Sequence, residues 1–241
     1  MQAACAMSEL AYAYRMQILL LVAASLVIVI GPGLWVSAVM KRYHIPRNRY
    51  ERTGGETARA LLDSLGLKHV ATEPTERGDH YDPVDKAVRL SPDNFKGSSL
   101  TALTVAAHEV GHAIQDASGF RPLHWRTRLV RWVAPIEKLG AAMLMLSPFI
   151  ALTSFRAIGI LGFLAGLATL CAGVAVHALT LPTELDASFV RALPLIRQQA
   201  ILRKDDLPRA RTLLTAAALT YVSGALQSLL NIARWWAILR R

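Results

Sequence analysis

The sequence has very few cysteines. Cys5 and Cys171 are the only two among 241 residues, one close to the N-terminus and the other inside an apolar run. A disulfide framework needs an even set of cysteines at regular spacings, and a thiolate metal site needs several of them close together. The sequence therefore argues against both, and a metal site in this chain would use histidine and carboxylate ligands.

Acidic residues are also scarce. The chain has 17 Asp and Glu against 27 Lys and Arg, a net charge of +10, although 53% of its residues are hydrophobic. A soluble domain of this size rarely combines these properties, whereas a membrane protein with basic flanks does so naturally. Nucleic-acid binding is the alternative, but no basic run interleaved with aromatic residues lies in a soluble stretch. We therefore expect the partner to be a lipid bilayer and not nucleic acid.

A long apolar stretch lies near the N-terminus. Residues 18–40 contain no charged residue, and residues 41–52 directly after them contain five Lys or Arg. A helix of this length crosses about 30 Å of hydrocarbon. A cleaved signal peptide is the alternative, but its apolar region would be shorter and its basic residues would come first. The sequence predicts an N-terminal tail over residues 1–17 and a transmembrane signal anchor over residues 18–40.

Three more apolar stretches follow in the second half of the chain. Residues 139–153 and 157–181 are separated by only a few residues, which predicts a transmembrane helical hairpin over 139–181. Residues 212–241 predict a C-terminal apolar helix that crosses the membrane, or packs on the other helices with a polar stripe turned inward. Basic residues gather in the segments between these stretches, so the positive-inside rule places those segments in the cytoplasm.

Residues 41–138 predict a compact cytoplasmic domain. Thr53 and Glu56 have the spacing of a capping box, which starts a helix that Gly66 ends. Residues 67–71 and 86–90 favour short strands, and residues 79–83 favour a turn between them. Residues 98–119 predict a further helix. The expected fold is a mainly α membrane protein, with transmembrane helices and a small α+β domain.

The last of these helices contains His108-Glu109-Val110-Gly111-His112, which reads H-E-x-x-H. Residues four apart lie on one face of a helix, so His108 and His112 can bind one Zn²⁺ through their imidazole nitrogens. Glu109 lies beside that face and can take a proton from a water at the metal. A surface helix with two incidental histidines is the alternative reading.

A catalytic zinc site needs a third protein ligand. Glu184 is the best candidate, because the hairpin between it and His112 leaves the cytoplasmic face of the membrane and returns to it. Glu184 then lies in a cytoplasmic segment, residues 182–211, on the same side as the histidines. We expect Pro182 to end the preceding helix and redirect the chain. The alternative, a carboxylate that stabilises a helix N-terminus, stays open at this point.

Three further residues are candidates for supporting roles. His80 and Tyr81 could donate a hydrogen bond to an oxyanion, although simple turn chemistry is the favoured explanation for both. Asp186 could orient a ligand imidazole, or it could be an exposed helix carboxylate.

These motifs together resemble one known family. The segments 79–83, 108–116, 181–188 and 216–222 are similar to those of the neutral zinc metallopeptidases of the YugP type, and the resemblance covers the chain from about residue 18. It departs from the family pattern at Thr183 and Leu185, where valine and phenylalanine are usual. The resemblance implies a multi-pass peptidase of the bacterial inner membrane, with a zincin-like domain of the gluzincin kind and a distant likeness to HtpX.

The resemblance also implies the site. It makes His108, His112 and Glu184 the ligands of one Zn²⁺ per chain and Glu109 the catalytic base. The expected function is a membrane-bound zinc endopeptidase whose active site faces the cytoplasm and whose substrates are peptides or proteins, membrane proteins among them. An intramembrane metalloprotease fits less well, because residues 98–119 are too short and polar to span. A non-catalytic zinc-binding scaffold would have no use for Glu109.

Overall fold

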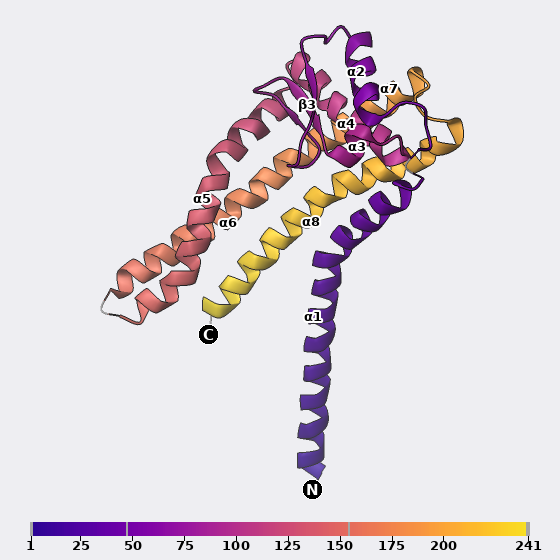
Figure 1. Cartoon of the computed structure of the whole chain (residues 1–241). Helices are drawn as coiled ribbons and strands as arrows, with labels where there is room; N and C mark the ends of the chain where they lie inside the picture. The colour runs from indigo at the N-terminus through magenta and orange to yellow at the C-terminus, as the bar shows by residue number, and fades with distance from the viewer. Residues whose placement is uncertain (1, 47, 154, 240–241) are drawn as a thin grey trace.

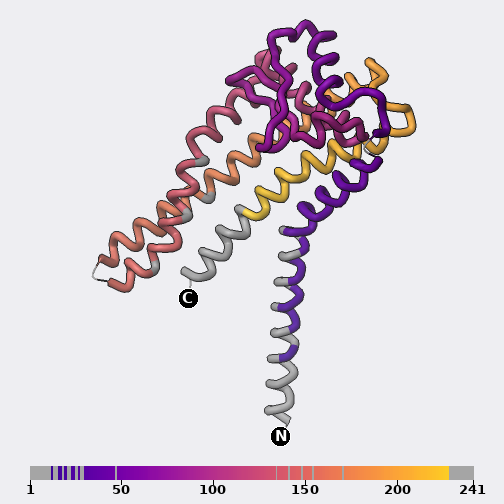
Figure 2. The backbone as a smooth tube through the Cα atoms, viewed as in Figure 1, coloured from indigo at the N-terminus to yellow at the C-terminus, as the bar shows by residue number. Residues whose placement is uncertain are grey.

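The computed structural model describes residues 2–46, 48–153 and 155–239 (Figure 2). Four long helices extend from a compact part in which the remaining elements gather (Figure 1). The long helices are α1 (Gln2–Tyr43), α5 (Arg121–Ala151), α6 (Arg156–Leu185) and α8 (Leu207–Leu239). Of the predicted N-terminal tail, Met1 and most side chains of residues 2–17 lie outside the described residues.

The compact part combines short helices with one small sheet. Its elements are α2 (Gly54–Ser64), β1 (Ala71–Pro74), β2 (His80–Asp82), β3 (Ala87–Leu90), α3 (Pro92–Lys96), α4 (Leu100–Ala117), the π-helix η1 (Asp186–Ala192), α7 (Leu193–Gln198) and the 3₁₀ turn η2 (Lys204–Asp206). The first six come from one continuous stretch, whereas the last three follow the α5–α6 pair. The compact part is therefore built from two segments that are far apart in the sequence.

The predicted helix boundaries in this part are confirmed. Thr53 accepts a hydrogen bond from the Glu56 backbone N–H, and the Glu56 carboxylate accepts one from the Thr53 N–H, which completes the capping box of α2. Gly66 and Gly119, just beyond the ends of α2 and α4, have φ angles of 74° and 66°. Such left-handed conformations favour glycine and end the helices there.

The sheet corrects two predictions. The strand predicted over residues 67–71 begins only at Ala71, because residues 67–70 form turns that bond back toward α2. The turn predicted over residues 79–83 is wrong for its middle part: His80–Asp82 is strand β2, antiparallel to β3, and Tyr81 pairs with Val88. Burial of Tyr81 outweighs the local turn preference. The turn follows instead, where Asp82 accepts hydrogen bonds from the backbone of Val84 and Asp85.

Helix α4 lies at the centre of the compact part and packs against α2, β3, η1 and α7. Most of its side chains are buried on every face, which explains its content of alanine and other small residues. The sheet order is β1-β3-β2, with β1 parallel to β3, and β3 buries its apolar side chains against α4. A helix enclosed in this way holds its side chains in fixed positions.

The long helices α5 and α6 form the antiparallel pair that the sequence predicts, but α5 starts earlier than expected. It begins at Arg121 and not near residue 139, so the basic segment 121–138 continues directly into the apolar part of the helix. Gly140 of α5 lies against Thr169 of α6, where a Cβ atom would clash. Small residues at a crossing let two apolar helices approach closely.

Two continuous helices, Arg121–Ala151 and Arg156–Gln198, are long and apolar enough to cross a membrane. The second corrects the expectation for Pro182: the chain stays helical through Pro182 and continues into η1 and α7. A proline removes one backbone hydrogen bond from a helix, but the helix continues here because the Asp186 N–H donates to the Pro182 carbonyl oxygen and the next residues, Thr183 and Glu184, are buried. Glu184 is therefore held on a rigid helix and not on a loop.

Candidate metal centre

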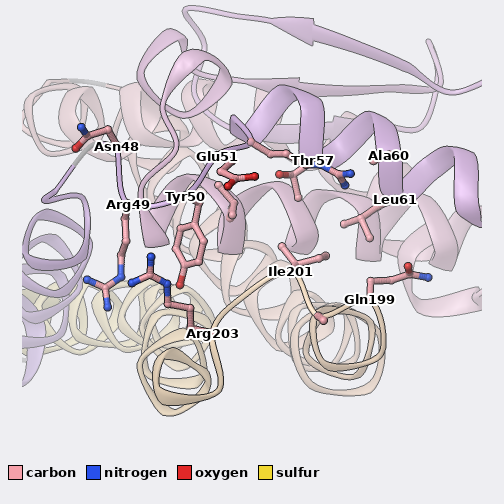
Figure 3. A pocket seen from close by; sticks show the side chains of 13 residues that line it. Asn48, Arg49, Tyr50, Glu51, Thr57, Ala60, Leu61, Gln199, Ile201 and Arg203 are labelled. Atoms are coloured by element: carbon pink, nitrogen blue, oxygen red, sulfur yellow. The ribbon is translucent and has the colours of Figure 1, made fainter.

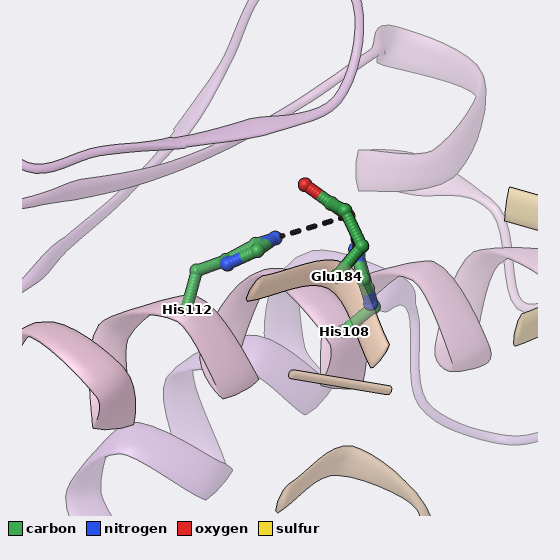
Figure 4. A group of neighbouring side chains, drawn as sticks. All are labelled: His108, His112 and Glu184. Carbon is green, nitrogen blue, oxygen red and sulfur yellow. Dashed lines mark hydrogen bonds and ion pairs between the residues drawn. The ribbon is translucent and has the colours of Figure 1, made fainter. Parts of the chain in front are cut away.

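Helix α4 presents His108 and His112 on one face (Figure 4). Ser99 caps the helix by accepting a hydrogen bond from the Ala102 backbone N–H, which fixes its first turn. The two imidazole rings lie nearly perpendicular to each other, with centroids 4.8 Å apart. Both side chains are buried, so their orientation is set by packing and by hydrogen bonds.

Glu184 reaches the same point from the end of α6. Its Oε2 atom lies 3.1 Å from His108 Nε2 and 3.5 Å from His112 Nε2. One ligand atom from each of the three side chains lies within 4.8 Å of the other two. All three residues are buried. The chain thus brings a carboxylate next to two imidazoles, although Glu184 lies 72 positions after His112 in the sequence.

Gly111 permits this approach. The π-helix η1 directly follows α6, and the carbonyl oxygen of Ala187 in η1 lies 2.6 Å from the place where a Cβ of residue 111 would be. Any side chain at position 111 would therefore push η1 and α4 apart. A π-helical segment is common at functional sites, where it changes the direction of neighbouring side chains.

We expect Gly111→Ala to destabilise the protein by about 1–3 kcal/mol, the usual cost of overpacking a filled interior. The same shift would move Glu184 away from the histidines and lower metal affinity. Thermal unfolding and metal content measure the two effects. Gly162→Ala is a matched control, because a Cβ atom there meets its nearest neighbour at an ordinary distance of 3.8 Å. Equal stability of the two variants would contradict the close contact.

Hydrogen bonds orient both imidazoles. Ser188 Oγ lies 3.1 Å from His108 Nδ1, and Gln115 Oε1 lies 2.9 Å from His112 Nδ1. The Gln115 amide donates in turn to Asp186 Oδ2 at 2.8 Å and to the Thr183 carbonyl oxygen. Asp186, the sequence candidate for this role, thus acts through Gln115, while Arg191 donates to it at 2.6 Å. Such contacts leave Nε2 of each histidine facing the metal position.

Glu109 is buried beside the three residues. The pKa of its carboxyl is raised to about 7, mainly by burial and also by the charges of Glu184 and Asp79, while His108 opposes the shift. Glu109 and Glu184 line one cavity of about 210 Å³. A carboxylate whose pKa lies near neutrality can both accept and return a proton.

The wall of this cavity comes from four helices. Helices α1 and α8 supply most of its apolar side chains, and Asp79 and Tyr221 are among its polar groups. The guanidinium of Arg126 lies 6.0 Å from the centre of the Tyr221 ring and 3.3 Å from Glu184 Oε1. His80 and Tyr81 are not part of this wall. The Tyr81 hydroxyl donates to Asp116 at 2.6 Å, and His80 contacts the Gly78 carbonyl oxygen.

Comparison with known proteins agrees with this geometry. Residues 18–240 match the family described as "Putative neutral zinc metallopeptidase". The chain belongs to this zinc metallopeptidase family. It is 36% identical over 219 residues to the "Putative membrane protease YugP" of Bacillus subtilis (strain 168), an alignment that covers 86% of this chain and 91% of that protein. No solved structure matches the chain. Membership supports a peptidase function, and the relative's name together with the two long apolar helices supports association with a membrane.

The residues present fit the zinc that the family name implies. Two imidazoles and a carboxylate are the donor set of many catalytic zinc sites. Glu184 Oε1 is buried and accepts no hydrogen bond, although Arg126 is near it. A buried carboxylate oxygen without a hydrogen-bond partner is costly unless a cation binds it. The observed arrangement therefore suits a divalent metal ion between the three side chains.

Two residues near the candidate site were not predicted from the sequence. Gln115 lies in the H-E-x-x-H helix, three residues after His112, and that spacing is a usable signal for a contact on one helix face. Tyr221 lies in a segment that contributes to the family resemblance, but its distance from the motif gives no hint that it faces Glu109.

Proposed function

We propose that this chain is a membrane-bound zinc-dependent endopeptidase. One observation carries the proposal: His108, His112 and Glu184 direct ligand atoms at a common point, and Glu109 lies beside that point in the same cavity. A purely structural zinc site would close the fourth position with another protein ligand. Here His108, Glu109 and Glu184 line a cavity of about 210 Å³, which has room for water.

His108, His112 and Glu184 would hold the metal, one ion per chain. When bound, Zn²⁺ supplies Lewis-acid chemistry, since it polarises a carbonyl group and acidifies water. Glu109 then takes a proton from the attacking water and delivers it to the leaving amine. Its raised pKa of about 7 suits both steps. Ser188 and Gln115 hold the two imidazoles in the tautomer that leaves Nε2 free for the metal.

Tyr221 is the best placed oxyanion donor. It lines the same cavity as Glu109 and Glu184, and Arg126 lies over its ring. A hydroxyl donor in a site sheltered from water stabilises negative charge that develops on a carbonyl oxygen.

We expect Tyr221→Phe to lower kcat by about 10²–10³-fold, the effect typical of removing one oxyanion donor. Metal content should stay unchanged, because the hydroxyl is not a ligand. Tyr81→Phe is the control, because it removes a tyrosine hydroxyl outside the cavity and should change kcat far less. The lost hydrogen bond to Asp116 should lower stability by about 1 kcal/mol. A larger kcat loss in Tyr81→Phe would reverse the assignment.

The cavity favours peptide substrates that approach along the membrane. Its apolar wall is formed by Val36 and Met40 of α1 and by Leu213, Leu214 and Ala217 of α8. These residues lie near the end of α1 and near the start of α8, the helices in which the sequence predicts the first and the last membrane span. The basic segments that flank the apolar stretches support a multi-pass topology with the site on the cytoplasmic side, in a bacterial inner membrane.

The test uses the detergent-purified full chain. We expect about one zinc per chain by elemental analysis and cleavage of an unfolded protein such as casein, and a chelator should abolish cleavage. Added zinc should restore it. Zinc without cleavage of any protein or peptide library would favour a non-catalytic scaffold. A chain that contains no zinc after growth with zinc would contradict the proposal.

A further inference from the structure

A second cavity lies where α1 ends and α8 begins. It has a volume of about 210 Å³ and is separate from the candidate metal centre. Its lining residues are Arg42, Tyr43, Ile45, Arg49, Leu100 and Arg209. Three of these six are arginines and none is acidic. We call it the arginine pocket.

One buried carboxylate holds two of the arginines in place. Arg49 binds Asp206 through two hydrogen bonds of 2.8 Å, and Arg209 binds it through one of 2.6 Å. Burial raises the pKa of Asp206, but hydrogen bonds from Arg49, Tyr50 and Arg209 outweigh this effect and lower the pKa to about 2. Asp206 is therefore charged, and it neutralises only one of the two guanidinium groups.

Arg42 adds an uncompensated charge. Its guanidinium lies 5.9 Å from the centre of the Tyr43 ring, and among the described residues it makes no ion pair. With Asp206 included, the pocket carries a net charge of +2. Guanidinium groups fixed by other contacts lose little conformational freedom when they bind an anion, and their planar donors match phosphate oxygens.

A larger neighbouring cavity of about 640 Å³ differs in the charges of its lining residues (Figure 3). Arg49 lines it as well, but Glu51 accompanies Arg52 and Arg203 in its wall, so its charges are partly compensated. The wall of the larger cavity thus includes a carboxylate, whereas no acidic residue lines the arginine pocket, and Asp206, which binds Arg49 and Arg209, is not among its lining residues.

The position of the pocket indicates the source of the anion. α1 and α8 pack against each other, and Arg42 lies two residues after the apolar stretch that the sequence predicts as a membrane anchor. Ile45 at the pocket edge is 74% exposed. Three guanidinium groups and an exposed apolar side chain at the end of two apolar helices match the level at which lipid headgroups lie.

We propose that the arginine pocket binds a phosphate group, supplied in the membrane by the headgroup of an anionic phospholipid. The pocket offers two donors fixed by Asp206 and a third, Arg42, that closes over the anion. Ile45 contacts the start of the acyl chains. This site is independent of zinc and of peptide cleavage, so its test does not depend on the proposed peptidase activity.

The experiment measures thermal unfolding of the detergent-solubilised full chain. Phosphatidylglycerol, phosphatidylcholine and inorganic phosphate are titrated separately, each at constant ionic strength. We expect phosphatidylglycerol to raise Tm in a saturable manner and phosphatidylcholine to have little effect. Arg42→Gln should weaken the apparent affinity about fivefold, the loss expected for one arginine beside an anionic lipid. Arg42 does not bind Asp206, so this variant leaves the buried cluster intact.

Arg211→Gln is the matched control, because Arg211 lies on the same helix as Arg209 but does not line the pocket. It should keep wild-type affinity. If inorganic phosphate alone gives the full shift and Arg42→Gln weakens it, the phosphate site stands and its source is soluble phosphate. Equal losses in both variants, or no preference for phosphatidylglycerol over phosphatidylcholine, would overturn the proposal.

Discussion

Replacing Glu109 by glutamine is expected to abolish peptide cleavage and to leave the bound metal in place. Glutamine has the same size and can fill the same buried position, so α4 and its two histidines should keep their arrangement. It cannot accept a proton from water or return one to the leaving amine. General acid–base catalysis contributes roughly 10²–10⁴-fold to a rate, and we expect a loss near the upper end because Glu109 performs both transfers.

The measurement compares kcat and zinc content of wild type and Glu109→Gln purified in parallel. Glu73→Gln is the control: it removes one carboxylate from the exposed pair with Arg89, far from α4, and should keep full activity. The amide should also relieve part of the desolvation cost of a buried carboxylate, so stability should not fall. A variant that retains more than about a tenth of wild-type kcat would exclude Glu109 as the base.

Glu184→Ala is expected to remove most of the metal affinity. Its Oε2 atom lies 3.1 and 3.5 Å from the two imidazole Nε2 atoms, which is where a shared ion would draw the three ligands together. Loss of a residue that only supports a ligand costs about 10–100-fold in metal affinity, and loss of the ligand itself should cost more. We therefore expect an affinity decrease beyond 100-fold, with cleavage lost as a consequence.

Competition with a chromogenic chelator measures this affinity, and zinc-dependent stabilisation in thermal unfolding gives an independent value. Asp186→Asn provides a graded comparison, because Asp186 contacts the site only through Gln115. It should lose affinity by no more than about 10–100-fold. Wild-type metal content in Glu184→Ala would sink the assignment of Glu184 as third ligand, while leaving the roles of His108 and His112 open to their own test.

These experiments test the metal centre and the arginine pocket independently of each other. The metal centre is tested by zinc content and cleavage, whereas the arginine pocket is tested by lipid-dependent stability of the same purified chain. Both sites use residues from the ends of α1 or α8, since Met40 faces the metal cavity and Arg42 the arginine pocket. The two cavities therefore share the C-terminal end of α1, although we propose chemically different partners for them.

Local interactions account for what could be predicted from the sequence. The capping box of Thr53 and Glu56, the helix stops at Gly66 and Gly119, and the placement of His108 and His112 on one face depend on contacts within a few residues. Spacing alone determines them, because helix geometry is the same in every protein. The apolar stretches of α5 and α6 could be predicted in the same way, since length and hydropathy decide whether a helix can cross a membrane.

Packing between residues that are far apart in the sequence determined the features that could not be predicted. Tyr81 became part of a strand because the core buries its ring, and the helix continued through Pro182 into the buried residues Thr183 and Glu184. Residue type and topology made Glu184 a candidate, but only the tertiary structure brings its carboxylate to His108, 76 positions earlier. Tyr221 and the arginine pocket depend on how α1, α6 and α8 are arranged around the compact part, an arrangement set by the fit of many side chains and not by any local pattern.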